Sequence, residues 1–176
     1  MTLTDRLIAP NATRGEVTAS LSVACAGAAL AFALAVHANL SMLCVAVIAL
    51  VAFDMFGGAV VNATGAAKRW FHRPGRTSVH HLGFVAIHVQ PFILASVVPG
   101  FGWLTAATIY AVALTGAVVV TTAPRPLRRP IAFGATAFGL MVVTSVLTVP
   151  HAVAWFAPVL LIKLLLAHLL PEEATG

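Results

Sequence analysis

Residues 40–64 read LSMLCVAVIALVAFDMFGGAVVNAT, a run of 25 mostly apolar residues that contains one acid, Asp54. A helix needs about 20 apolar residues to cross about 30 Å of hydrocarbon, so this run is long enough to span a bilayer. In lipid, each backbone polar group must be satisfied within its own segment, which favours a helix over an open strand. The stretch therefore predicts a transmembrane α-helix that carries a charged group at bilayer depth.

The rest of the chain has the same character. Its 176 residues are 60% hydrophobic and 9% charged, whereas a soluble domain typically carries about 25% charge. The sequence predicts an all-α, polytopic integral membrane bundle that forms one domain over residues 1–176. The bundle would contain six transmembrane helices, near 17–36, 40–64, 79–98, 103–122, 131–149 and 152–170.

The basic residues predict the orientation of this bundle. Nearly all of them precede the first segment or lie in two loops, between the second and third segments and between the fourth and fifth. Cationic loops stay in the cytoplasm. We therefore expect both termini to be cytoplasmic, with three antiparallel hairpins whose short turns point outward. The net charge of +5 is expected to serve topology and contact anionic headgroups, not nucleic acid.

A short internal similarity relates the second and fourth segments. Residues 58–64, GAVVNAT, match residues 116–122, GAVVVTT, at five of seven positions. At aligned positions the second segment has Asp54 and Asn62 where the fourth has Val112 and Val120. The polar groups thus belong to one copy of a candidate hairpin repeat, which favours a local function over a scaffold requirement.

The polar residues of the second and third segments predict a site within the membrane. Asp54 and Asn62 are eight residues apart and share one helix face. His88 lies about ten residues into the third segment, and His81 lies two turns earlier. Counted from the loop between two antiparallel helices, Asp54 is level with His88, and Asn62 is level with His81. We expect Asp54 and His88 to be catalytic, with Asn62 and His81 orienting the substrate.

Two further features extend this site. Pro91 removes a backbone donor and is expected to kink the third segment at the level of His88. Lys163, in the last segment, is placed to reach the level of Asp54; the alternative is that it snorkels to the cytoplasmic surface.

The loop between the second and third segments has two interpretations. It holds the topology, and its side chains also suit the capture of a phosphate or carboxylate above the polar residues. The residues expected to bind the substrate there are Arg69, Trp70, Arg73 and Arg76, with His72 beside them. The other basic loop, 124–130, is assigned to orientation alone.

Cofactor chemistry is not indicated by any ligand spacing. His81 and His88 are about 10.5 Å apart along a helix, too far for one metal ion without other ligands. We therefore name no metal ligands, and the sequence leaves both the metal content and the cofactor undetermined. The motifs of membrane phosphatidic-acid phosphatases, prenyltransferases and serine hydrolases are incomplete or absent. Cys25 and Cys44 lie in apolar runs and are expected to pack.

Three functions fit these residues. The first is a small intramembrane enzyme that uses Asp–His acid–base chemistry on a lipid-like or hydrophobic substrate with an anionic or polar head, entering from the cytoplasmic side. The second is a proton-coupled carrier or channel, and the third is an accessory subunit of a larger complex. The expected partners are membrane lipid and a hydrophobic or anionic small molecule. A homo-oligomer or a partner subunit is also compatible with the sequence.

Overall fold

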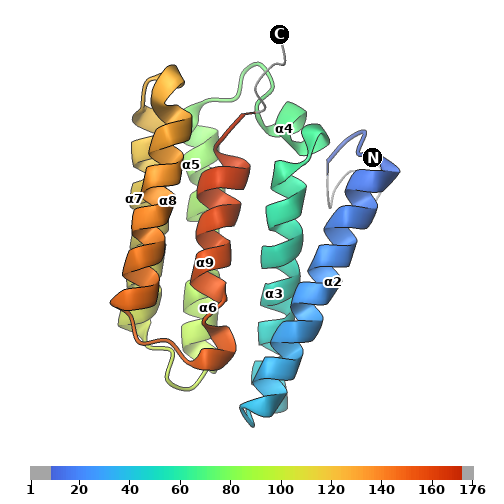
Figure 1. The fold of residues 1–176 in the computed structure, drawn as a ribbon, viewed down its shortest axis with the longest axis vertical. Coiled ribbons are helices and arrows are strands. Elements are labelled where there is room, and N and C mark those ends of the chain that lie inside the picture. The colour runs from blue at the N-terminus through green and yellow to red at the C-terminus, as the bar shows by residue number, and fades with distance from the viewer. Residues whose placement is uncertain (1–8, 172–176) are drawn as a thin grey trace.

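The computed structural model of the protein describes residues 9–171 and is helical throughout, with no strand in that range. Figure 1 shows long helices lying side by side in a bundle. The α-helices are α2 (Arg14–His37), α3 (Met42–Ala63), α4 (Gly65–Phe71), α5 (Ser78–Ala86), α6 (Gln90–Val97), α7 (Trp103–Thr122), α8 (Arg128–Ser145) and α9 (Phe156–Leu161). Two short 3₁₀ turns, η1 (Arg125–Leu127) and η2 (His151–Val153), precede α8 and α9, and a π-helix, η3 (Ile162–His168), continues α9.

Five stretches within residues 9–171 are long and apolar enough to cross a membrane. They are Arg14–His37, Met42–Ala63, Ser78–Val97, Trp103–Thr122 and His151–His168. This is the pattern of a multi-pass membrane protein. Each stretch coincides with one of the expected segments, to within a few residues at either end.

The remaining expected segment, 131–149, forms α8 with different bounds. The helix begins three residues earlier, at Arg128, because Pro130 fits the first turn of a helix, where its missing N–H is not needed. It ends at Ser145, ahead of Pro150, which cannot continue a helix. The 18 residues of α8 therefore include Arg128 and Arg129, which make it less apolar than the five spans.

The basic segments gather at one end of the bundle. In Figure 1, α4, the α4–α5 loop and the α7–α8 loop lie at the same end as the first turn of α2. The turns after α2, α6 and α8, which carry no Lys or Arg, lie at the opposite end.

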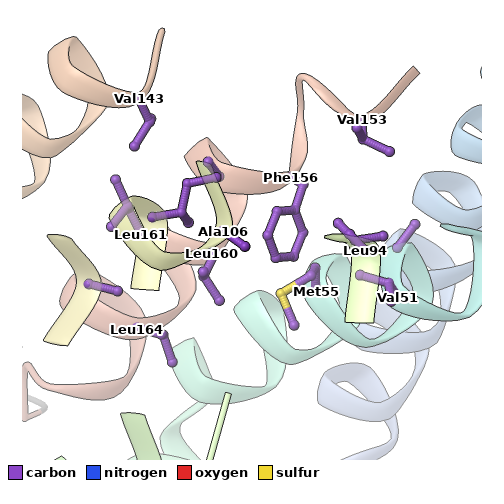
Figure 2. Packing of buried hydrophobic residues seen from close by; sticks show 14 of the residues in the cluster. Val51, Met55, Leu94, Ala106, Val143, Val153, Phe156, Leu160, Leu161 and Leu164 are labelled. Carbon is purple, nitrogen blue, oxygen red and sulfur yellow. The ribbon is translucent and has the colours of Figure 1, made fainter. Parts of the chain in front are cut away.

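The last span lies at the centre of the bundle. Buried residues make up 61% of His151–His168, against 22–39% of the other four spans. It packs against α3, α7 and α8, and Figure 2 shows Phe156, Leu160, Leu161 and Leu164 among side chains from these neighbours. Any polar group that this span carries must therefore find its partner inside the protein.

The segment expected as one helix at 79–98 is divided into α5 and α6. The kink predicted at the level of His88 is confirmed, and it is a full break over residues 87–89. Pro91 has no N–H to donate to Ile87, whose carbonyl instead accepts from Val89 at 2.9 Å. The carbonyl of Ala86 accepts from the Tyr110 hydroxyl of α7 at 2.8 Å. These contacts satisfy the broken backbone at bilayer depth, as lipid requires.

Small residues join α2 to α3. A Cβ on Gly27 would lie 2.4 Å from the Phe56 ring, and one on Gly57 would lie 2.8 Å from the Ala24 Cβ. Close approach of this kind is the usual means of helix association in lipid. At the basic end, the Glu16 carboxylate of α2 accepts from the Ala66 backbone N–H of α4 at 3.0 Å.

Candidate functional site

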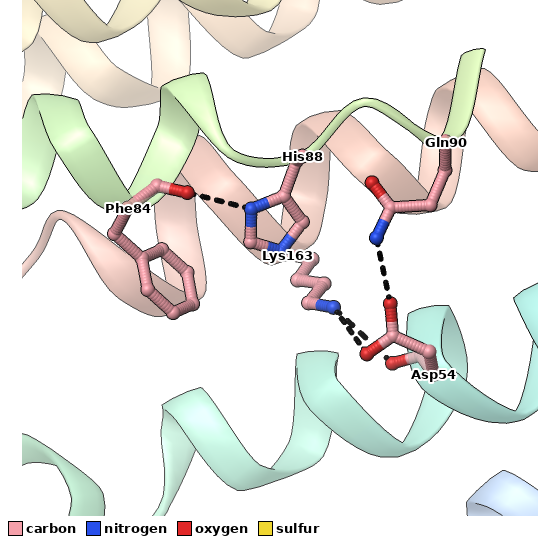
Figure 3. A network of polar contacts seen from close by, with 5 residues as sticks. All are labelled: Asp54, Phe84, His88, Gln90 and Lys163. Atoms are coloured by element: carbon pink, nitrogen blue, oxygen red, sulfur yellow. Dashed lines mark hydrogen bonds and ion pairs between the residues drawn. The ribbon is translucent and has the colours of Figure 1, made fainter. Parts of the chain in front are cut away.

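Asp54 of α3 forms an ion pair with Lys163 of η3. The Lys163 Nζ lies 2.9 Å from the Asp54 Oδ1 and 3.3 Å from the Asp54 backbone oxygen (Figure 3). The Lys163 side chain is 3% exposed, whereas that of Asp54 is 49% exposed. The buried Lys163 ammonium is thus paired with a carboxylate side chain that is half exposed.

Gly58 makes this contact possible. It follows Asp54 by one turn, and a Cβ at this position would lie 2.6 Å from the Lys163 Cε and 2.7 Å from its Nζ. The lysine therefore runs across the glycine and does not snorkel to the surface. In the candidate repeat, Gly116 has the equivalent place, and a Cβ there would lie 2.9 Å from the Leu165 Cδ1. Both glycines receive a side chain from η3, but only the first receives a charge.

Gln90 hydrogen bonds to the second carboxylate oxygen of Asp54. Its Nε2 donates to the Asp54 Oδ2 at 3.1 Å, and Gln90 is in position because α6 begins there, directly after the break. The Gln90 Oε1 is buried and has no hydrogen-bond partner. Buried acceptors are rarely left unpaired, so this oxygen marks a place where a donor from a ligand would be favourable.

His88 lies beside the pair but does not hydrogen bond to Asp54. Its Nδ1 is 2.6 Å from the Phe84 carbonyl oxygen, and its ring lies near the Lys163 side chain (Figure 3). A carbonyl only accepts, so Nδ1 carries the proton and Nε2 of the neutral ring is an acceptor. Asp54 and His88, which were expected at the same level, therefore bind other partners and not each other. A full positive charge is the stronger partner for a carboxylate, and Gly58 gives Lys163 access to it.

Asn62 and His81, which were also expected at the same level, do not pair with each other, because His81 binds His168. Asn62 is 4% exposed on α3, but the His81 Nδ1 lies 3.2 Å from the Nε2 of His168, in the central span. His168 is 2% exposed, and its Nδ1 is buried without a partner. The sequence did not indicate His168 as part of this group, although it lies five residues after Lys163 in the same span.

His72, His81 and His168 form a histidine cluster at the basic end. The His72 and His81 rings stack with centroids 4.6 Å apart, and the His72 Nε2 donates to the His168 carbonyl at 3.0 Å. Burial lowers the pKa of His72, and the nearby charges of Lys68 and Arg128 lower it further. Phe84 connects the histidine cluster to the Asp54–Lys163 pair. The centroids of the Phe84 and His168 rings are 3.8 Å apart, and the Phe84 carbonyl oxygen accepts from His88. Within residues 9–171, no three His, Cys, Asp or Glu side chains are placed to hold a metal ion.

A cavity of about 1050 Å³ opens beside the histidine cluster, between the α4–α5 and α7–α8 loops. We call it the basic cavity, because its lining includes Lys68, Arg76, Arg125, Arg128 and Arg129, together with His72 and His81. The loop at 124–130, assigned from sequence to orientation alone, thus supplies three of its five cations. The two loops come together here because both pack against the same end of the central span. The role of loop 124–130 in orientation stays a prediction.

The other loop residues expected to bind substrate lie elsewhere. The Arg73 guanidinium stacks 3.7 Å over the Trp70 ring and donates to the Trp70 carbonyl. Arg69 is on α4, the helix whose Ala66 N–H donates to the Glu16 carboxylate of α2. Neither Arg69, Trp70 nor Arg73 lines the basic cavity, so only Arg76 of the expected arginine group does.

No protein-family model, curated protein or solved structure matches this chain.

Proposed function

We propose that this protein is a small intramembrane enzyme that performs acid–base chemistry on a lipid-like or hydrophobic substrate with an anionic or polar head. One observation carries the proposal. A fully buried lysine pairs with a half-exposed aspartate at a break between two helices. Irregular backbone at bilayer depth is tolerated where it is buried in protein or lines a cavity, and intramembrane ionisable residues are rarely without a function.

The proposed roles follow from the contacts. The Lys163 ammonium donates to one carboxylate oxygen of Asp54, and the Gln90 amide donates to the other. Asp54 would remove a proton from the substrate at its exposed edge. The unprotonated Nε2 of His88 would accept or return a proton, since its Nδ1 is held by Phe84. Isomerisation, cyclisation and hydrolysis each include such a transfer.

The substrate would enter from the cytoplasmic leaflet. We place the basic end of the bundle and both termini in the cytoplasm, because Lys and Arg are retained on that side. We also assign α8 as a sixth span, which gives three antiparallel hairpins with their short turns outside. In this orientation the basic cavity faces the cytoplasm.

An accessory subunit is the second candidate, favoured by the exposure of Asp54. A carboxylate at bilayer depth that is 49% exposed would suit a polar residue on a partner helix as well as a substrate. A proton-coupled carrier ranks lower. Beyond Asp54, towards the turns without basic residues, the packed core is formed by apolar side chains such as Ile48, Leu94 and Phe101.

Comparative lipid analysis distinguishes these functions. Membranes from cells that express the wild-type chain or the Asp54→Asn variant at matched levels would be analysed by mass spectrometry with chromatographic separation of isomers. An enzyme predicts at least one lipid species that changes with the wild type and not with Asp54→Asn. Identical lipid profiles, with the wild-type chain purifying in fixed ratio with a second membrane protein, would instead identify an accessory subunit.

A further inference from the structure

The basic cavity brings together charges from two loops that are about fifty residues apart in sequence. Arg76 comes from the α4–α5 loop, Arg125 from η1 and Arg128 from the start of α8. The His81 ring lines the same cavity. Among the described residues, the lining contains five Lys or Arg and no carboxylate. Retention of loops in the cytoplasm requires only that cations be present at this end, not that they converge on one cavity.

Backbone groups add to this field. Thr77 and Ser78, at the N-terminus of α5, line the cavity, as do Arg128 and Arg129, at the N-terminus of α8. The N-terminus of a helix carries a partial positive charge that favours anions. One layer behind the wall, the His168 Nε2 lies 3.2 Å from the Nδ1 of His81, which lines the cavity. The other ring nitrogen of His168, Nδ1, is buried without a partner.

We propose that the basic cavity binds a phosphate group, carried by an anionic lipid or by a free phosphate compound. Phosphate suits this cavity better than a carboxylate, because it presents more acceptor oxygens and up to two charges to several arginines at once. The volume of about 1050 Å³ admits a headgroup together with the first part of a chain. The inference deepens the proposed function by naming the substrate class, and it rests on that function only for the fate of the bound molecule.

Binding can be measured without turnover. The full chain would be purified in uncharged detergent and titrated by calorimetry at constant ionic strength with inorganic phosphate, with dihexanoyl phosphatidic acid and with dihexanoyl phosphatidylcholine. We expect saturable binding of the phosphatidic acid, and weaker or no binding of the choline lipid. A phosphatidic acid affinity at least tenfold above that of inorganic phosphate identifies a lipid headgroup as the ligand. Equal affinities identify a free phosphate compound.

Matched variants locate the site. Arg76→Gln and Arg125→Gln each remove one charge-assisted contact and should raise the Kd about tenfold. Arg69→Gln removes the same charge from α4 but lies outside the cavity, so its Kd should stay within about twofold of the wild type, because no direct contact is lost. Arg128 is excluded from the test because it also donates to the carbonyls of Thr121 and Ala123, at the end of α7.

The acidic residues that follow the cavity in sequence provide one more control. Pro171 lines the cavity, and Glu172 and Glu173 come next in the chain. All titrations would be repeated in an E172Q/E173Q background, so that competition from these carboxylates cannot hide a site. Absence of saturable phosphate or phosphatidic acid binding in both backgrounds overturns the inference, as does equal weakening by Arg69→Gln and Arg76→Gln. Phosphate binding with no change in cellular lipids would count against the proposed enzyme alone.

Discussion

The Nζ of Lys163 and the Oδ1 of Asp54 are 2.9 Å apart, yet one side chain is 3% exposed and the other 49%. The two members of this pair therefore depend on each other unequally. Without Asp54, the lysine charge is left unpaired at the centre of the bundle. Without Lys163, the aspartate still reaches the surface of the protein and keeps Gln90 as a donor.

We predict that Asp54→Asn destabilises the protein more than Lys163→Met does. An unpaired Lys charge at the centre of a membrane helix costs about 3 kcal/mol on insertion scales, and Asn cannot neutralise it. The double variant Asp54→Asn/Lys163→Met should recover most of that loss, because no buried charge is left. Thermal unfolding in one detergent would compare the three variants with the wild type. Equal losses for both single variants, adding up in the double variant, would show that the pair is not coupled.

Gly58→Ala should disrupt the ion pair without altering any polar residue. The new Cβ would fall within 2.7 Å of the lysine terminus, so Lys163 must move away from Asp54. Overpacking costs about 1–3 kcal/mol, partly offset by the better helix propensity of Ala. Gly83→Ala is the matched control, because a Cβ there meets nothing within 4 Å. Melting temperatures of the two variants, and of Gly58→Ala/Lys163→Met, would be compared. No recovery in the double variant would mean that Gly58 does not act through Lys163.

These two predictions rest on the contact between Asp54 and Lys163. The sequence predicts how deep each of these residues lies, but not which side chains meet. A rise of about 1.5 Å per residue fixes how deep a residue lies once the loop edge is known, so Asp54, His88 and Lys163 were rightly placed near one level. Rotation about the helix axis was not fixed, because these helices are apolar on nearly every side and give little periodic signal. Sequence therefore could not decide whether His88 or Lys163 would reach Asp54.

The basic cavity was missed for a related reason. Both basic loops were expected at one end, and they are there, but sequence does not give the order of helices around a bundle. The neighbours of Arg76 are Arg125 and Arg128 because α7 and α8 pack beside the end of the central span. The kink at the level of His88, in contrast, was predicted from Pro91 alone, because its cause is local.

Stability should fall as the pH is lowered, and His72 should account for part of the fall. Its pKa in the folded protein is lowered by burial and by the charges of Lys68 and Arg128, and the His81 and His168 rings also face it. The unfolded chain then binds more protons, so stability is full above the unfolded pKa of about 6.5 and decreases as the pH falls towards the folded pKa.

The measurement is the melting temperature between pH 7.5 and 5. His72→Gln, which keeps a donor for the His168 carbonyl, should flatten this dependence, by at most about 1.4 kcal/mol per pH unit. A slope that is the same in His72→Gln as in the wild type would contradict the assignment.

The last prediction concerns α8, the helix that sequence alone expects to span and that is less apolar than the five spans. Its ends offer exposed positions on either side, Pro126 in η1 and Thr148 in the turn before α9. In a background with Cys25→Ala and Cys44→Ala, an impermeant thiol reagent applied to intact cells should label Thr148→Cys and not Pro126→Cys. Permeabilised cells should label both, which controls for accessibility. The reason is that Arg125, Arg128 and Arg129 hold their end in the cytoplasm, while Arg128 also anchors that end by donating to the carbonyls of Thr121 and Ala123.

Labelling of both positions in intact cells, or of neither, would mean that α8 does not cross the bilayer. Labelling of Pro126→Cys alone would invert the bundle and place the basic cavity outside.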